Sequence, residues 1–378
     1  MLQSCEAITD LQNAILTQGE QWLLTEEPAT AAQLISQIWM STLLSVSDRA
    51  RESVLKKVEE QCAYALEHKP MGPGLHDGIS GVALAIEYAY QSGQRYSEHR
   101  AALRSLHSEL AILGGTSRLG NCDLISGAAG IGLAISTVRP ERSDLVAGII
   151  ENILSAVDFS CAPPLSALDE TDRRGLRGPD LGIAHGLPGL MLVLVRLRCG
   201  AEFTLVERID SFLRHAANWL GSCANSAGAG SLFPYVFGRE TSSRLAWCYG
   251  DLSAGYALLV SGSCAKDDSA LGLGRAAVER AIARPFEDSG VGDAFLCHGT
   301  CGLLALMESI NLAHGGLIPL SYRSRWESIL EEQAKVALAT STLSGFDFLD
   351  GWTGVGLYLS QASGRVSNGW RSTMLLHD

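Results

Sequence analysis

The sequence predicts an all-α protein, an α/α toroid in which about seven inner helices are wrapped by about seven outer helices. Three observations predict it: a glycine motif that recurs along the chain, an apolar run after each motif, and more polar amphipathic stretches between these runs. Strand-like alternation of apolar and polar residues is scarce. No Pro/Ser-rich linker or sharp change of composition divides the chain, so we expect residues 1–378 to form a single domain.

Glycine is enriched: it fills 40 of 378 positions, against a usual share of about 7%. It recurs as Gly-x-x-Gly pairs that begin at Gly78, Gly127, Gly186, Gly299 and Gly351, and a sixth copy at Gly250 has Ser253 as its last residue. The copies start about 55 residues apart on average, a period typical of stacked supersecondary units. We expect each motif, between about residues 74 and 363, to lie where a loop enters an inner helix at one end of the barrel. A first unit, before residue 70, lacks the motif.

The segments between the motifs alternate between two kinds of helix. Each motif is followed by a run that is apolar on every side, as expected of a helix buried between two layers. These runs are residues 82–86, 131–135, 190–195, 256–260, 303–307 and 355–359. The stretches between them have apolar residues three or four apart, which is typical of an outer helix with one face on the core. Examples are residues 51–60, 100–110 and 323–332.

Composition excludes several classes of protein. The chain is 47% hydrophobic and 19% charged, which excludes a disordered protein, and its net charge of −12 argues against nucleic acid as the main partner. The most apolar run, residues 189–195, is far shorter than the ~20 residues of a transmembrane helix. The N-terminus has no signal-peptide pattern, so we expect a cytoplasmic protein whose ten cysteines are mostly reduced and buried.

Chemically active side chains gather shortly before the first glycine of each motif. Cys248 and Cys297 both lie two residues before that glycine and His298 lies one before it, so the fold brings these three to one mouth of the barrel. Two thiolates, an imidazole and an open fourth position are typical of a catalytic zinc site. The sequence therefore predicts one Zn²⁺ per chain on these residues. The other polar residues in this part of each unit are Asp77, Asp123, His185 and Asp350.

The remaining candidates have ordinary structural interpretations. Cys301 lies inside a motif, where other units carry non-ligand residues such as Ala129, so we expect it to pack in the core. Asp77 and Asp350 are interpreted as helix caps, and Asp123 as either a cap or a site residue. The basic stretch 172–178 is interpreted as a solvated loop, and whether it touches a substrate stays open.

Four strings resemble motifs of the LanC lanthionine synthetase cyclase family. They are Arg-Leu-Ala-Trp-Cys-Tyr-Gly at 244–250, Leu-Cys-His-Gly-Thr-Cys-Gly at 296–302, Gly-Ile-Ala-His-Gly-Leu-Pro-Gly at 182–189 and Asp-Leu-Ile-Ser-Gly-Ala-Ala-Gly at 123–130. The resemblance covers about residues 74–363 and implies the same toroid, with zinc on Cys248, Cys297 and His298. It also implies further active-site residues, which are Asp123, His185, Arg244 and Tyr249. One departure is Ser253, where the family usually has Gly, so we expect the Cys-Tyr-Gly backbone to enter its helix differently.

The resemblance also implies a reaction. A cysteine thiol of a dehydrated precursor peptide adds to dehydroalanine or dehydrobutyrine and forms a lanthionine or methyllanthionine ring. His185 suits the general acid/base role, with Asp123 orienting it or taking the thiol proton, and Arg244 and Tyr249 holding that carboxylate or the substrate carbonyl. A separate dehydratase and a transporter are implied as partners, which would place the protein at the periphery of a membrane-associated modification complex.

Three other functions remain open from the sequence. An enzyme of the same family could add glutathione to dehydroamino acids at the same zinc site. A protein prenyltransferase also activates a thiolate on zinc in an α/α barrel, but its ligands are usually Asp, Cys and His. A non-catalytic, zinc-containing scaffold could bind the peptide for other enzymes.

Overall fold

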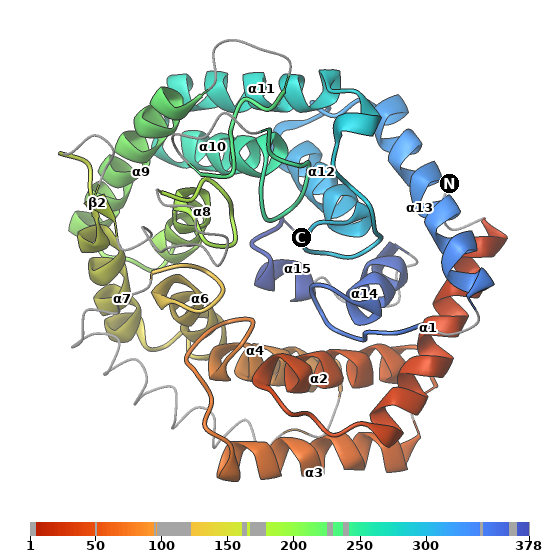
Figure 1. Cartoon of the computed structure of the whole chain (residues 1–378). Helices are drawn as coiled ribbons and strands as arrows, with labels where there is room; N and C mark the ends of the chain where they lie inside the picture. Colours follow the sequence, from red (N-terminus) through yellow and green to blue (C-terminus); the bar gives the residue numbers. More distant parts are fainter. Residues whose placement is uncertain are drawn as a thin grey trace.

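Two concentric rings of helices make up the computed structural model (Figure 1). It describes residues 5–49, 51–93, 96, 122–160, 165–166, 179–224, 230–236, 242–340, 343–362 and 369–377. In this part of the chain the inner ring consists of α2 (Ala31–Val46), α4 (Ile79–Gln91), α6 (Ala128–Val138), α8 (Leu187–Arg198), α10 (Asp251–Ala265), α12 (Thr300–His314) and α14 (Trp352–Ala362). The outer ring consists of α1 (Glu6–Thr25), α3 (Glu52–His68), α7 (Ser143–Ala156), α9 (Phe203–Cys223), α11 (Asp268–Ala283) and α13 (Leu320–Ala339). The expected outer segment 100–110 lies outside the described residues.

Each inner helix packs against the next, and the ring closes where α14 returns to α2. The outer ring closes in the same region, where α13 packs against α1. The predicted all-α toroid is therefore confirmed. The remaining described elements are the short helix α15 (Gly369–Thr373), the 3-10 turn η2 (Phe286–Asp288), and the antiparallel pair of β1 (Val157–Asp158) and β2 (Leu165–Ser166).

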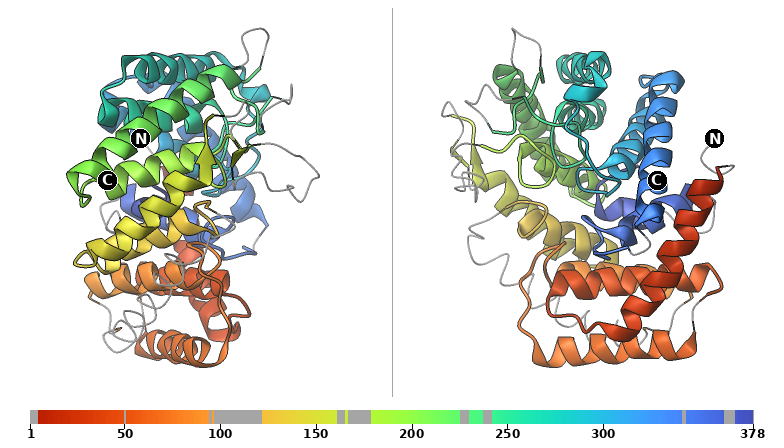
Figure 2. Two further views of the ribbon diagram at one scale, coloured as in Figure 1. Left: turned by 90° about the vertical axis from the view of Figure 1, so that its left-hand side faces the viewer. Right: turned by 45° about the vertical axis from the view of Figure 1, so that its right-hand side comes forward.

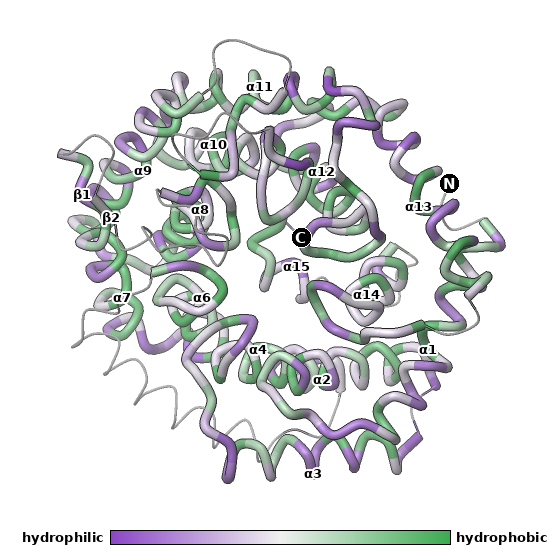
Figure 3. The backbone as a smooth tube through the Cα atoms, viewed as in Figure 1, coloured by the Kyte–Doolittle hydropathy of each residue, from purple (hydrophilic) through white to green (hydrophobic). Residues whose placement is uncertain are grey.

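The two rings differ in burial as the sequence predicts. Helix α10 is buried on nearly every side, whereas α9 buries one face, including Leu205, Ile209 and Phe212, and exposes the other. Figure 3 shows the same contrast, with hydrophilic residues distributed along the outer helices. None of the helices in the described residues combines the length and hydropathy that a membrane-spanning segment needs.

The glycine motifs lie at the start of the inner helices, and the side views place the loops that precede these helices on one side of the ring (Figure 2). The first glycine of a motif is the N-cap of α4, α6, α8, α10 and α12. The second glycine is required by close packing, because a Cβ on Gly302 would collide with the carbonyl oxygen of Leu296. Gly81, Gly130, Gly189 and Gly354 each meet the carbonyl oxygen six residues earlier in the same way.

The motif with Ser253 has a different backbone, as expected. Gly250 has a φ of +100°, whereas Gly299 at the same place before α12 has a φ of −104°. A positive φ of this kind is accessible to glycine and strained for other residues. The Cys-Tyr-Gly segment thus enters α10 by its own route.

Candidate active site

Backbone hydrogen bonds join the neighbouring loops at the mouth of the barrel. The Ile183 amide donates to the Cys248 carbonyl at 2.9 Å, and the Cys248 amide donates to the Cys297 carbonyl at 3.2 Å. The Cys297 amide in turn donates to the Leu349 carbonyl at 2.9 Å. The loops before α8, α10, α12 and α14 are therefore held side by side, which brings the two cysteines of separate repeats together.

Cys248, Cys297 and His298 form a group that could hold a metal ion. One ligand atom from each lies within 4.8 Å of the others, with Cys248 buried and the other two half-buried. The pKa of Cys297 lies well above its usual range. The largest cause is the hydrogen bond with Cys248, and desolvation by burial is the second. Two thiols held this close ionise together only if a cation neutralises them. The donor set therefore fits a thiophilic metal such as zinc.

Two carboxylates flank the imidazole of His298. Its Nε2 lies 3.4 Å from Asp293 Oδ2 and its Nδ1 lies 3.3 Å from Asp350 Oδ1. A carboxylate beside the ring of a metal-binding histidine orients the ring and raises its basicity. Asp350 therefore faces the candidate ligand His298.

One cavity of ≈ 330 Å³ collects six of the seven predicted site residues. It is lined by Ala184, His185, Tyr235, Arg244, Cys248, Tyr249, Cys297 and His298. The candidate metal ligands thus share one wall with the candidate acid/base, His185. A mechanism that needs a metal-activated nucleophile beside a proton donor has both in this space.

Asp123, the seventh predicted residue, lies behind His185. Its Oδ2 is 2.5 Å from His185 Nδ1, and its Oδ1 accepts a hydrogen bond of 2.8 Å from the Ser126 amide. Only 4% of Asp123 is exposed, whereas 47% of the His185 side chain is. Asp123 is not the cap of α6, because the N-cap is Gly127; its carboxylate stabilises the turn before the helix and contacts the imidazole of His185, and its role in the reaction stays a prediction.

Tyr249 and Arg244 are held by residues that the sequence analysis missed. The Tyr249 hydroxyl donates to Asp180 Oδ2 at 2.7 Å, so its carboxylate partner is Asp180 and not Asp123. Arg244 donates from Nε and from its backbone amide to the Tyr235 hydroxyl, at 3.1 and 3.0 Å. Desolvation raises the pKa of Asp180 to about 6, although hydrogen bonds from Tyr249 and Gly182 oppose the shift.

Two of the missed residues have a signal in the repeat. Asp180 lies six residues before Gly186, the same place that Asp293 has before Gly299. His76 lies two residues before Gly78, which is the place of Cys248 and Cys297 in their own units. Tyr235 has no such signal, because it lies outside the glycine motifs.

The remaining sequence interpretations have mixed outcomes. Asp77 does not cap its helix, because the N-cap of α4 is Gly78, which has no side-chain cap, and Asp77 accepts from Ser126 Oγ at 2.9 Å. Cys301 is fully buried in the hydrophobic core, as expected. The stretch 172–178 lies outside the described residues.

A second, larger cavity of ≈ 660 Å³ lies along α13, between it and the loops before α12 and α14. Its lining is largely apolar, with Phe295, Ile329, Val336 and Trp352 among the contributors. None of the predicted site residues lines it, so the smaller cavity is the candidate active site.

Comparisons with known proteins agree with this architecture. A family model described as "Lanthionine synthetase C-like protein" matches residues 40–375. A solved structure of a nisin cyclase superposes with a TM-score of 0.71 at 19% sequence identity, covering 97% of each chain. No curated protein sequence matches significantly.

Proposed function

Because the chain belongs to the lanthionine synthetase C-like family, we propose that it is a zinc-dependent lanthionine cyclase. Its substrate is a dehydrated precursor peptide, in which a cysteine thiol adds to dehydroalanine or dehydrobutyrine and closes a thioether ring. The observation that carries the proposal is the single cavity shared by Cys248, Cys297, His298 and His185. The whole chain, residues 1–378, acts as one cyclase domain with one Zn²⁺.

The metal ligands have complementary tasks. Cys248 and Cys297 hold the ion as thiolates, and their two negative charges balance its charge. His298 would supply the third donor through one ring nitrogen, and the carboxylate beside the other nitrogen, Asp293 at Nε2 or Asp350 at Nδ1, would orient its ring. Bound Zn²⁺ lowers the pKa of the substrate thiol, which is otherwise mostly protonated at neutral pH.

The addition forms a C–S bond, breaks the C=C π bond and, overall, transfers the thiol proton to the α-carbon. The substrate sulfur forms a bond to the β-carbon, the double-bond electrons move onto the carbonyl as an enolate, and the α-carbon then takes a proton. His185 delivers this proton, because it lines the cavity and Asp123 fixes its Nδ1 edge. Arg244 and Tyr249 line the same cavity. The guanidinium of Arg244 binds the substrate carbonyl, on which the enolate charge develops, whereas the Tyr249 hydroxyl already donates its proton to Asp180.

The reaction requires other proteins. Dehydration of the precursor comes from a separate dehydratase, and a transporter exports the product. We place the cyclase in the cytoplasm, at the periphery of a membrane-associated complex with these partners.

Metal analysis of cysteine variants tests the metal centre. Cys248→Ala and Cys297→Ala are expected to lose most zinc and all cyclase activity, whereas the control Cys301→Ala keeps both because its thiol lies in the core. Cyclisation leaves the peptide mass unchanged, so it is measured by alkylating the remaining free thiols and recording the mass. Full zinc occupancy in both ligand variants would overturn the assignment.

Replacing His185 tests the chemical step separately. His185→Asn is expected to keep its zinc and to form rings about 10²–10⁴-fold more slowly, the usual contribution of a general acid/base. A single-turnover time course on dehydrated peptide measures the rate. Cyclisation at the parent rate would assign the proton to another residue.

Glutathione supplied as the only thiol tests the alternative function, which predicts an adduct with dehydrated peptide.

A further inference from the structure

The C-terminal segment, residues 369–377, lies inside the inner ring (Figure 1). It contains α15 and the turn that follows, and nearly all of it is buried. A buried segment that carries polar side chains needs hydrogen-bond partners for them.

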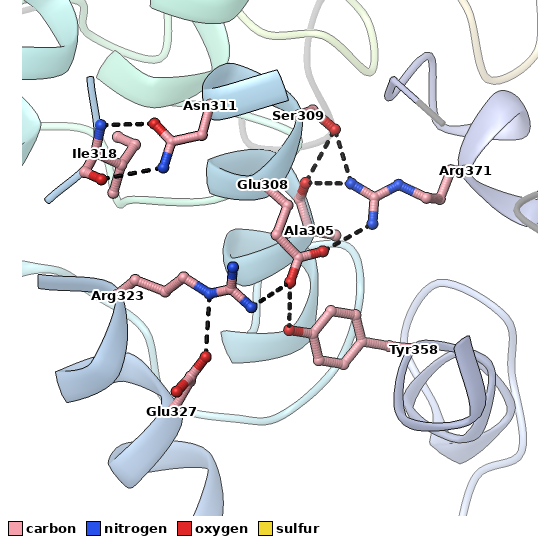
Figure 4. Close-up of polar contacts among 9 residues, drawn as sticks. All are labelled: Ala305, Glu308, Ser309, Asn311, Ile318, Arg323, Glu327, Tyr358 and Arg371. Carbon is pink, nitrogen blue, oxygen red and sulfur yellow. Dashed lines mark hydrogen bonds and ion pairs between the residues drawn. The ribbon is translucent and has the colours of Figure 1, made fainter. Parts of the chain in front are cut away.

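Arg371 supplies the first anchor, which Figure 4 shows. Its Nη1 donates to Glu308 Oε2 at 2.9 Å, and its Nη2 donates to the Ala305 carbonyl and to Ser309 Oγ at 2.8 and 2.9 Å. Its Nε donates to the His377 carbonyl at 2.8 Å, which folds the tail back on α15. Only 2% of Arg371 is exposed, so these partners compensate a buried charge. The segment is thereby fastened to α12, the helix that follows His298.

The acceptor of this anchor is itself held in place. Glu308 also accepts a hydrogen bond of 2.8 Å from Arg323 on α13, and the Tyr358 hydroxyl on α14 lies 3.3 Å from it (Figure 4). Arg323 pairs with Glu327 as well. The C-terminal segment is thus connected through one carboxylate to three helices of the toroid.

On its other side the segment accepts hydrogen bonds from the α10 unit. Trp247 Nε1 donates to the Met374 carbonyl at 2.8 Å, and the Tyr256 hydroxyl donates to the Leu375 carbonyl at 3.0 Å. Both donor side chains are fully buried. They differ in position: Trp247 is the residue directly before Cys248, whereas Tyr256 lies within α10.

His76 packs against the same tryptophan. Its ring lies edge-on to Trp247, with centroids 6.2 Å apart, and is stacked on Phe348 with centroids 5.9 Å apart. The backbone of Thr373 in the C-terminal segment raises the pKa of His76, but desolvation has the larger effect and lowers this pKa to about 4. Trp247 therefore lies between an aromatic neighbour and the Met374 carbonyl.

We propose that the C-terminal segment is an internal support for the metal centre, and that Trp247 and Arg371 are positioning residues. The Trp247–Met374 hydrogen bond orients Trp247 and, through the peptide bond to the next residue, Cys248. Arg371 keeps the Met374 carbonyl in place. This inference rests on the proposed metal site, and it concerns residues that touch neither metal nor substrate.

Two variants test it against a purely structural role. Trp247→Phe and Tyr256→Phe each remove one buried hydrogen bond to the segment, and both are expected to lower the melting temperature, Trp247→Phe by more because it also leaves a cavity. Only Trp247→Phe is expected to weaken Zn²⁺ binding, by about 10–100-fold, the usual effect of losing a residue that supports a metal ligand. Affinity is measured by competition with a chromogenic chelator on the full-length metal-free protein.

Arg371→Lys provides a second measurement, because lysine cannot reproduce the four directed contacts of the guanidinium. Faster hydrogen exchange at residues 374–377, together with weaker Zn²⁺ binding, would support the proposal even if Trp247→Phe failed to fold. Equal Zn²⁺ affinity in Trp247→Phe and Tyr256→Phe would overturn the supporting role and leave the proposed metal site intact. Faster exchange in Arg371→Lys with an unchanged Zn²⁺ affinity would do the same. A parent protein that binds no Zn²⁺ would overturn the proposed metal site as well.

Discussion

The loops that enter α10 and α12 carry a cysteine at the same place in the repeat, yet they reach it by different backbones. Cys248 and Cys297 each lie two residues before the glycine N-cap of their helix. That glycine has a φ of +100° at Gly250 and of −104° at Gly299. Equivalent positions in the repeat thus do not require equivalent local structures.

The α12 loop follows the common pattern of the barrel. The Thr300 amide donates to the Asp293 carbonyl seven residues earlier at 2.9 Å, and Gly302 packs on the Leu296 carbonyl. The first residues of α4, α8 and α14 make the same seven-residue hydrogen bond, which joins Ile79 to Gly72, Leu187 to Asp180 and Trp352 to Gly345. Close backbone packing defines this kind of loop.

The α10 loop adds buried side chains to its backbone packing, in which Gly250 lies against the Arg244 carbonyl. Asp251, the first residue of α10, accepts from the Phe233 amide at 2.8 Å and pairs with Arg284 Nη2 at 2.7 Å. Arg284 also donates to the Ser243 carbonyl at 2.6 Å, and both charged side chains are almost fully buried. The comparison teaches that a buried ion pair can take over the supporting role that a second glycine has elsewhere.

Breaking the ion pair should have the largest effect. Asp251→Ala leaves Arg284 charged and buried, so we expect a loss of about 3–5 kcal/mol in the free energy of unfolding. Thr300→Val, at the same position of α12, is the matched control and should cost only about 1 kcal/mol. Urea denaturation of the metal-free proteins measures both. Similar losses in the two variants would contradict the proposed difference between the loops.

Adding a side chain to the α12 loop should have the next largest effect. The Cβ of Gly302→Ser meets the Leu296 carbonyl, so the loop that carries Cys297 must shift. We expect a destabilisation of about 2–3 kcal/mol, as for other overpacked sites, together with weaker Zn²⁺ binding. Melting temperature and chelator competition measure the two effects. A melting temperature and a Zn²⁺ affinity equal to those of the parent would contradict this prediction. They would show that the α12 loop accepts a side chain at the position of its second glycine, as the α10 loop does at Ser253.

A smaller, pH-dependent effect is expected at Asp180, which holds Tyr249 in the α10 loop. Its pKa is about 6 in the folded protein and 3.8 as the ordinary value, so ionisation favours the unfolded chain. The resulting destabilisation is absent below about pH 4, grows as the pH rises and is complete above about pH 6. Asp180→Asn lacks it, so the stability of the variant relative to the parent should rise across this interval. A difference independent of pH, from melting temperatures between pH 4 and 7, would contradict the raised pKa.

The smallest effect is expected for Ser253→Gly. The buried Ser253 hydroxyl has no hydrogen-bond partner among the described residues, so removing it relieves an unsatisfied group. Glycine in a helix costs about 1 kcal/mol, which offsets that gain. We therefore expect a change below about 1 kcal/mol in urea denaturation. A large loss would mean that the serine makes a contact on which α10 depends.

The sequence by itself determined the architecture and the position of the candidate ligands. Apolar runs and glycine motifs record local contacts, namely a helix buried on all sides and a backbone approached closely, and these recur in each unit. The common place of Cys248 and Cys297 before their glycines followed from that recurrence. So did the expected departure at Ser253, since a missing glycine excludes the usual close packing.

Only the tertiary structure decided which residues support these positions. Tyr249 pairs with Asp180 because the loop before α8 lies beside the loop before α10, and Tyr235 reaches Arg244 from a segment outside the repeat. The burial of Arg371 depends in the same way on where the chain end lies relative to α12. Two of these pairs join residues more than 60 positions apart, and the meeting of all three pairs depends on how the loops pack and on side-chain direction. Spacing along the chain records neither of these.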